Sequence, residues 1–222
     1  MQLPRFYPIL DVGSARKRHL EISAVARDIL EAGATILQFR HKEFFGRDVF
    51  DELERVAGLC RQAGALLVVN DRVDIAQMLS SRHFDVGVHL GQQDLTPADA
   101  RRVTGAAAII GFSTHNELQL REAESSAASQ PADYLAFGPI FGTASKQNPD
   151  PVVGLDALRR LRPLTSRPLV AIGGITRANA RNVIDAGADS VAVIGDLFPS
   201  DLSSGPGRIR ARAAEWLAVL GR

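Results

Sequence analysis

The feature of this sequence that most constrains its fold is a repeated switch between short apolar runs and longer segments of helical periodicity. Eight runs rich in Val and Ile predict β-strands at residues 6–11, 35–40, 66–70, 87–90, 109–113, 134–138, 169–173 and 190–195. Because these runs are nearly continuous in apolar residues, they indicate strands that are covered on both faces, as in a parallel sheet.

The segments between the runs predict helices. Residues 19–31 and 47–62 carry apolar side chains at helical spacing and charges on the opposite face. An Ala-Gly-Ala repeat at residues 32–34, 63–65 and 186–188 ends three predicted helices, since glycine readily adopts the left-handed conformation found there. Eight such units predict a single (β/α)8 TIM barrel with a parallel eight-stranded core over residues 1–222. A doubly wound open sheet is the alternative.

Charge and composition exclude several classes of protein. The 222 residues carry a formal net charge of +1, so there is no basic excess to neutralise nucleic-acid phosphates. No apolar run approaches the roughly 20 residues that cross a bilayer, and the N-terminus does not resemble a signal peptide. A single cysteine, Cys60, excludes an internal disulfide and fits a reducing compartment. We expect a cytoplasmic protein that binds small molecules, not nucleic acid or membranes; homo-oligomer formation is left open.

Candidate site residues lie at the carboxyl ends of the predicted strands, where active sites of (β/α)8 barrels are built. The second strand ends with Gln38, Arg40 and Lys42 on one side of the alternating pattern. Two cations there indicate a multiply charged anion, because arginine grips phosphate with a planar fork and lysine as a point charge. Solvated loop charges are the alternative.

Two carboxylates follow neighbouring strands, Asp71 after the third and Asp94 after the fourth. Together they favour a Mg²⁺ site, because Mg²⁺ takes one or two carboxylates and completes its shell with water and phosphate oxygens. Alternatively, Asp71 caps a helix and Asp94 belongs to the turn before the helix that starts at Thr96.

The fifth and sixth units carry further polar candidates. Ser113 is expected either to bind a ligand or to cap the next helix, and His115 either to act as an acid or base or to start that helix. The loop at residues 138–146 contains Thr143 and Lys146 and is long enough to close over a phosphorylated ligand. His89 is expected to pack inside the fourth strand.

Glycines follow the last two strands and predict a second anion site. Gly174 follows the seventh run, and Gly195, which precedes Asp196, ends the eighth. Glycine lets the backbone approach a ligand, and phosphate often binds to the backbone after these two strands of a barrel.

Six motifs, taken together, resemble the thiamine phosphate synthase family, and they occur in its order and spacing across nearly the whole chain. They are Gln38-x-Arg40-x-Lys42, Asn70-Asp71-Arg72, His89-Leu90-Gly91-Gln92-Gln93-Asp94, Gly111-x-Ser113, Gly138-Pro139-x-Phe141-x-Thr143-x-x-Lys146 and Ala171-Ile172-Gly173-Gly174-Ile175. The resemblance implies a (β/α)8 transferase of thiamine biosynthesis. It would join hydroxymethylpyrimidine pyrophosphate to thiazole phosphate with Mg²⁺, by a dissociative mechanism in which pyrophosphate leaves first.

The resemblance also implies roles for the candidate residues. Gln38, Arg40, Lys42 and Asn70 would hold the pyrimidine pyrophosphate, Asp71 and Asp94 would bind Mg²⁺, Ser113 and Lys146 would contact the pyrophosphate or pyrimidine, and Thr143, Gly174, Gly195 and Asp196 would hold the thiazole phosphate. Arg40, Ser113 and Lys146 would be the catalytic residues, since charge on the leaving group must be stabilised.

One departure and two alternatives accompany this interpretation. Asp196 stands where the family pattern leads us to expect a small neutral residue, and its carboxylate would repel a phosphate unless it points outward. The related thiazole tautomerase shares the barrel and uses a histidine after the fifth strand, which His115 matches. A non-catalytic phosphate-binding barrel is the other alternative. The joint presence of the metal and pyrophosphate residues favours the synthase.

Overall fold

The computed structural model of the chain describes residues 2–125, 132–143, 150–198 and 207–221. None of the helices in these segments combines the length and the apolar character that a membrane span requires.

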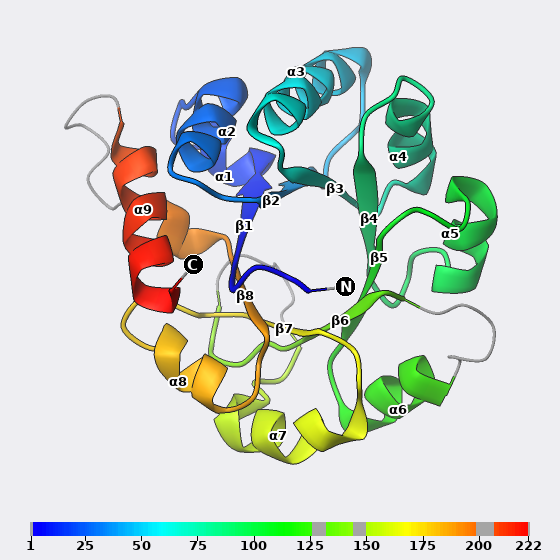
Figure 1. The fold of residues 1–222 in the computed structure, drawn as a ribbon, viewed down its shortest axis with the longest axis vertical. Coiled ribbons are helices and arrows are strands. Elements are labelled where there is room, and N and C mark those ends of the chain that lie inside the picture. The colour runs from blue at the N-terminus through cyan, green and yellow to red at the C-terminus, as the bar shows by residue number, and fades with distance from the viewer. Residues whose placement is uncertain (1, 126–131, 144–149, 199–206, 222) are drawn as a thin grey trace.

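Eight parallel strands close into a barrel in the order in which they occur along the chain (Figure 1). They are β1 (Phe6–Asp11), β2 (Ile36–Arg40), β3 (Leu66–Asn70), β4 (Val86–Leu90), β5 (Ile110–Thr114), β6 (Tyr134–Phe137), β7 (Leu169–Ile172) and β8 (Ser190–Val193). Strand β8 pairs with β1 and leaves no edge open. The barrel prediction is therefore confirmed, and the open sheet is wrong. Strands β6, β7 and β8 end one or two residues early; after β7 the chain turns away at Gly173, whose φ is +98°.

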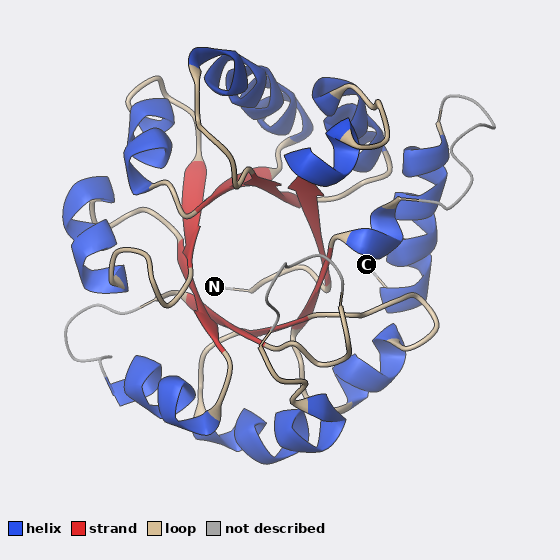
Figure 2. Ribbon diagram, turned by 180° about the vertical axis from the view of Figure 1, so that it is seen from behind, coloured by secondary structure: helices blue, strands red, loops and turns tan. Residues whose placement is uncertain are grey.

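Helices form an outer ring around the strands, as Figure 2 shows from behind. They are α1 (Val12–Arg16), α2 (Ile22–Glu31), α3 (Arg47–Ala63), α4 (Val73–Ser80), α5 (Pro97–Thr104), α6 (Glu117–Ser125), α7 (Gly154–Leu161), α8 (Ala180–Asp185) and α9 (Arg208–Leu220), with 3-10 turns η2 (Arg162–Leu164) and η3 (Gly195–Leu197). Gly64 ends α3 in the left-handed conformation, as its sequence repeat predicts. Helix α2 starts at Ile22, later than predicted, because the backbone at His19 has a positive φ of +56°.

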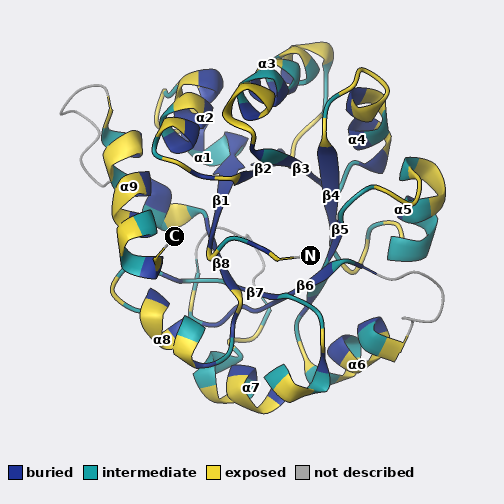
Figure 3. Ribbon diagram, viewed as in Figure 1, coloured by how far each residue is buried: buried dark blue, intermediate teal, exposed yellow. Residues whose placement is uncertain are grey.

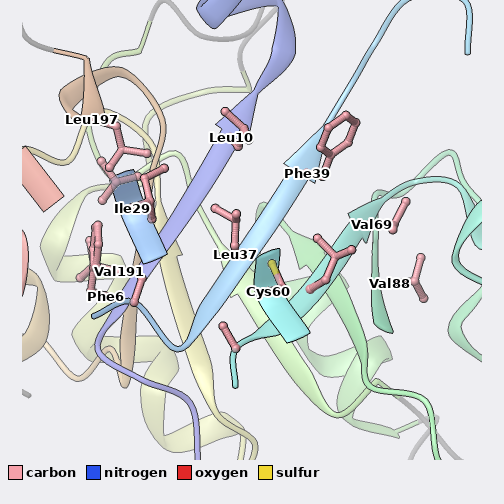
Figure 4. Packing of buried hydrophobic residues seen from close by; sticks show 14 of the residues in the cluster. Phe6, Leu10, Ile29, Leu37, Phe39, Cys60, Val69, Val88, Val191 and Leu197 are labelled. Carbon is pink, nitrogen blue, oxygen red and sulfur yellow. The ribbon is translucent and has the colours of Figure 1, made fainter. Parts of the chain in front are cut away.

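Two apolar layers hold this architecture together, and the exposed residues of the helices face away from the barrel (Figure 3). The outer layer packs strands against helices; Figure 4 shows Leu37 and Val69 of the strands together with Ile29 and Cys60 of the helices. The inner layer fills the barrel with Tyr7, Ile9, Ile36, Val68, Tyr134, Ala136, Val170 and Ala192. Because side chains alternate across a strand, the residues that continue this inner set are directed toward the carboxyl end of the barrel.

Strand register determines which polar residues meet at that end. Asp11 of β1 lies opposite Arg40 of β2, and Asn70 of β3 lies opposite His89 of β4. The first four strands therefore bring their terminal polar residues to adjacent positions on the rim of the barrel.

Candidate active site

A pair of carboxylates lies just beyond β3 and β4. The Asp71 Oδ2 atom accepts a hydrogen bond from Lys42 Nζ at 2.6 Å. Asp71 does not cap α4, because Arg72 occupies the cap position. The backbone of Asp71 has a φ of +65°, and its amide donates to the His89 carbonyl at 2.8 Å, which holds the residue in place. Asp94 Oδ2 accepts from the Gly91 amide at 2.7 Å. Asp94 therefore belongs to the turn, as predicted, and its carboxyl group also lies within hydrogen-bonding reach of Asp71.

The surroundings of Asp94 change the pKa of its carboxyl group. Its pKa is raised above the usual aspartate value, first by burial and then by the neighbouring Asp71, which acts both as a like charge and as a hydrogen-bond partner. Two carboxylates that disfavour each other's charge bind a cation well, because the cation relieves the repulsion. Within the described segments no third His, Cys, Asp or Glu joins them. The pair matches the one or two carboxylates that Mg²⁺ uses when water and phosphate oxygens complete its shell.

Arg40 ends β2 on the same rim of the barrel and is held by Asp11. Its Nη1 atom forms an ion pair with Asp11 Oδ2, and the two side chains are only 17% and 11% exposed. The other Asp11 oxygen accepts from the Ser14 amide at 2.8 Å and caps α1. The guanidinium is therefore fixed at the barrel rim rather than solvated in a loop. Lys42 is half-exposed.

Asn70 supplies a buried donor that faces this cluster of charges from the end of β3. The residue is 8% exposed, and its Nδ2 atom has no hydrogen-bond partner among the described residues. A buried donor without a partner costs about 1–3 kcal/mol, so such groups are informative when they occur beside a candidate site. An oxygen acceptor at this place, from water or from a ligand, would satisfy the donor.

Gln38 on β2 is buried and Ser113 on β5, three strands away around the barrel, is partly buried. Gln38 Nε2 donates to Tyr7 Oη at 3.1 Å, and Ser113 Oγ lies 2.9 Å from His89 Nε2. Ser113 does not cap α6, since Asn116 accepts the hydrogen bond from the Gln119 amide there. Burial lowers the pKa of His89 to about 4, so its imidazole is neutral near pH 7.

The loops after β5 and β6 meet at His115. Its Nδ1 atom lies 2.7 Å from the Gly138 carbonyl oxygen and 3.6 Å from Asp150 Oδ2. Thr143 is partly buried on the same loop. Lys146 lies outside the described residues, so its predicted place on the pyrophosphate stays a prediction.

The loops after β7 and β8 form a second region. Gly174 has a φ of +62°, and a Cβ there would press on Phe141 Cβ at 2.8 Å, so only glycine fits. Gly195 is exposed at the start of η3. The Asp196 carboxylate pairs with Arg177 Nε at 3.1 Å and with Arg212 Nη1 at 3.6 Å. Two guanidiniums thus pair with the Asp196 carboxylate, which the sequence predicts to repel a phosphate unless it points outward.

Four residues of the barrel rim and interior are not among the predicted site residues: Asp11, Tyr7, Tyr134 and His89. For His89 the sequence predicts only packing inside the fourth strand. Asp11 and Tyr7 continue the inward alternation of β1, a signal that was available in the sequence. The partnership of Tyr7 with Tyr134 joins residues 127 positions apart and gives no local signal.

A closed (β/α)8 barrel with paired carboxylates and cations at the strand ends defines a class of barrel proteins suited to phosphorylated ligands. A family model described as thiamine monophosphate synthase matches residues 6–197, and the chain belongs to that family. The resemblance inferred from the motifs is thereby confirmed.

Individual relatives agree with this family. The chain is 45% identical to a thiamine-phosphate synthase of Koribacter versatilis over 99% of this chain and 97% of the relative. It is 42% identical to that of Chloroflexus aurantiacus over 89% and 86%. Among solved structures, thiamine phosphate pyrophosphorylase from Pyrococcus furiosus matches with a TM-score of 0.79 and 31% identity, covering 97% of this chain and 95% of that one. Tryptophan synthase of Mycobacterium tuberculosis, at 15% identity and a TM-score of 0.68, shares the fold alone.

Proposed function

We propose that this chain joins hydroxymethylpyrimidine pyrophosphate to thiazole phosphate in a Mg²⁺-dependent reaction that yields thiamine phosphate and pyrophosphate. Thiamine-phosphate synthase activity, and with it the class of transferase, follows from the family and its curated relatives. The single observation that carries the cation and pyrophosphate roles is the Asp71–Asp94 pair, with Lys42 beside it and Arg40 on the same rim. The buried free cysteine is in keeping with a cytoplasmic location.

In this proposal the pyrophosphate binds at the rim formed by the first four strands. Asp71 and Asp94 hold Mg²⁺, which when bound supplies positive charge against the phosphate oxygens. Arg40 is already oriented by Asp11, so it grips a phosphate without losing much side-chain freedom. Lys42 and the unpaired amide of Asn70 add two donors. Lys146 would add a further cation from the loop.

The chemistry needs leaving-group stabilisation more than it needs a base. The bond between the pyrimidine methylene carbon and the pyrophosphate oxygen breaks, and its electron pair leaves on the oxygen. The thiazole nitrogen then donates its lone pair to the methylene cation. Donors aimed at the departing oxygens lower this barrier because charge grows there in the transition state. Arg40, Ser113 and Lys146 take this role in the proposal, and Gln38 holds the pyrimidine.

The thiazole phosphate binds, in the proposal, to the loops after β7 and β8. The backbone at Gly174, Gly195 and Asp196 provides the donors, and Thr143 adds a hydroxyl. The ion pairs of Asp196 with Arg177 and Arg212 support this assignment, because they compensate a charge that would otherwise oppose a phosphate.

The decisive experiment incubates the protein with both substrates and Mg²⁺ and measures thiamine phosphate by conversion to a fluorescent product. We expect product only when both substrates are present, and none after EDTA treatment until Mg²⁺ is restored. Asp71→Ala is expected to lower kcat by at least about 100-fold, because it removes a carboxylate from the cation site. The matched control is Asp156→Ala, which removes an exposed carboxylate on α7 and is expected to keep full activity.

His115 separates the synthase from the tautomerase alternative in the same assay. The imidazole is engaged by the Gly138 carbonyl and is not among the residues around Asp71 and Asp94. His115→Ala is therefore expected to retain most thiamine phosphate formation. Loss of the main activity in His115→Ala, with full activity in Asp71→Ala, would transfer the assignment to the tautomerase.

A further inference from the structure

Five buried or part-buried side chains from five strands form a hydrogen-bonded chain across the barrel interior. Gln38 Nε2 lies 3.1 Å from Tyr7 Oη, Tyr7 Oη 2.7 Å from Tyr134 Oη, Tyr134 Oη 3.0 Å from His89 Nδ1, and His89 Nε2 2.9 Å from Ser113 Oγ. The chain joins the residue proposed to hold the pyrimidine to the serine proposed to contact the pyrophosphate. Nothing in the dissociative reaction itself requires the three residues in between.

In this hydrogen-bonded chain, only one direction of donation gives every buried proton an acceptor. Gln38 donates to Tyr7, so the Tyr7 hydroxyl proton must go to Tyr134, its other partner. Tyr134 then donates to His89 Nδ1, which must be unprotonated, and the His89 proton lies on Nε2. His89 donates to Ser113 Oγ. With the Gln38 amide oriented as a donor to Tyr7, the reverse direction would leave the Tyr7 proton buried without an acceptor, which is costly.

Close packing fixes the geometry of this chain. The rings of His89 and Tyr134 stack with their centroids 5.6 Å apart, and Tyr7 meets Tyr134 edge-on at 5.9 Å. Gly111 makes this arrangement fit, since a Cβ there would overlap the Tyr134 hydroxyl and come within 2.5 Å of His89 Nδ1. Burial raises the pKa of Tyr7 to about 12 and that of Tyr134 well above its ordinary value, so both hydroxyls keep their protons.

We propose that His89 and Tyr134, backed by Tyr7, are positioning residues that commit the Ser113 hydroxyl to donate a hydrogen bond to an oxygen of the departing pyrophosphate. Because Ser113 Oγ already accepts from His89, its own proton is directed away from the imidazole. A hydroxyl oriented in advance does not have to rotate as charge develops on the leaving group, so its contribution falls on the rate rather than on substrate binding. This inference rests on the proposed function.

A double-mutant cycle tests the inference through Tyr134→Phe, Ser113→Ala and the double variant. Tyr134→Phe keeps the ring and removes the hydroxyl that determines which His89 nitrogen carries the proton. We expect kcat for thiamine phosphate formation to fall by about tenfold, with KM for the pyrimidine substrate within about twofold of wild type. In the Ser113→Ala background the same change is expected to have no further effect, because the hydroxyl that it positions is gone. Single-turnover assays measure the slow variants.

His89 gives an independent arm. His89→Gln keeps an N–H that reaches toward Ser113 and is expected to retain more activity than His89→Leu, which has no donor. The matched control is Thr114→Val, next to Ser113 on β5, which removes a buried hydroxyl bonded to the Ala136 carbonyl. It is expected to lower the thermal midpoint without lowering kcat. Where Tyr134→Phe does not fold, His89→Leu takes its place in the double-mutant cycle and is likewise expected to have no further effect in the Ser113→Ala background.

The outcomes separate this inference from the proposed function. A wild-type protein that forms no thiamine phosphate overturns the proposed function. A wild type that forms it, together with a Tyr134→Phe variant of unchanged kcat, overturns the positioning role alone. An equal loss from Tyr134→Phe with and without Ser113 also overturns it, because that additivity indicates an effect on the barrel interior that does not pass through the serine.

Discussion

In the proposed cation site, protons would compete with Mg²⁺ for the carboxyl group of Asp94. Burial and the neighbouring Asp71 raise the pKa of this group, so it stays protonated at pH values where an ordinary aspartate is ionised. The cation needs the ionised form. We therefore expect the Mg²⁺ concentration for half-maximal activity to rise as the pH is lowered from neutrality toward the range in which an ordinary aspartate titrates, and to begin rising above that range. Mg²⁺ titrations of initial rate at several pH values measure this dependence.

Asp94→Asn is the matched variant for this titration. It removes the titrating group and keeps an oxygen at the same place, so the Mg²⁺ requirement is expected to be higher at every pH and to vary less with pH. An unchanged Mg²⁺ requirement in wild type across this pH range would show that Asp94 does not compete for the cation.

Individual residues differ in how far their sequence context revealed them. Asp71 and Asp94 could be paired in advance, because they follow consecutive strands and consecutive strands are neighbours in a parallel barrel. The ion pair between Asp11 and Arg40 could not, since it depends on a register in which these two residues lie opposite each other. Tyr134 acquires its role only when the barrel closes and brings it to Tyr7.

At the scale of elements, Asp196 links η3 to α9 and to the loop after β7. Arg212 of α9 reaches both the Asp196 carboxylate and its carbonyl oxygen, the latter at 2.9 Å, and Glu215 pairs with the same arginine at 3.2 Å. We expect Asp196→Ala to raise KM for thiazole phosphate by roughly three- to tenfold, because η3 loses its side-chain ion pairs with Arg177 and Arg212. This change in KM corresponds to about 1 kcal/mol. KM for the pyrimidine substrate, measured in the same assay, is expected to stay unchanged.

A lower KM for thiazole phosphate in Asp196→Ala would contradict this expectation. It would mean that the carboxylate repels the phosphate in spite of its two arginine partners. Asp185→Ala serves as control, since Asp185 ends the nearby helix α8 and is exposed.

Element order was predictable because each strand is a continuous apolar run and each helix has a one-sided apolar face. Element ends were less so. The run at residues 190–195 remains apolar through Ile194, but β8 ends at Val193, because the chain then turns into η3. Hydrophobicity records burial, and residues beyond a strand end can be buried without pairing in the sheet.

At the scale of the whole molecule, the barrel interior is a layered core of aliphatic side chains that encloses the rings of Tyr7 and Tyr134. Tyr134 and His89 occupy the space that a side chain at position 111 would need. The composition shows the glycines but not this complementarity, since it depends on which strands face each other across the barrel. The polar chain toward Ser113 is built into this core, so the stability of the fold and the geometry of the site depend on the same contacts.

Two glycine-to-alanine changes test this dependence with opposite expected signs. In Gly111→Ala the new methyl group would overlap Tyr134 and approach His89 Nδ1 to 2.5 Å, so the free energy of unfolding is expected to fall by about 1–3 kcal/mol or more. Gly58 lies within α3, and a Cβ there meets no heavy atom within 4 Å. Gly58→Ala is therefore expected to raise the free energy of unfolding by about 0.5–1 kcal/mol, since alanine favours a helix interior over glycine.

Urea unfolding measures both changes, and kcat separates them further. Gly111→Ala is expected to lose activity together with stability, because the rings that must move are those that direct the Ser113 proton. Gly58→Ala is expected to keep the wild-type kcat, since α3 contributes to the outer layer alone. A Gly111→Ala protein as stable as wild type would contradict this expectation, because it would show that Tyr134 can move aside for the methyl group. A stable but slow Gly111→Ala protein would show that catalysis requires closer positioning of these rings than folding does.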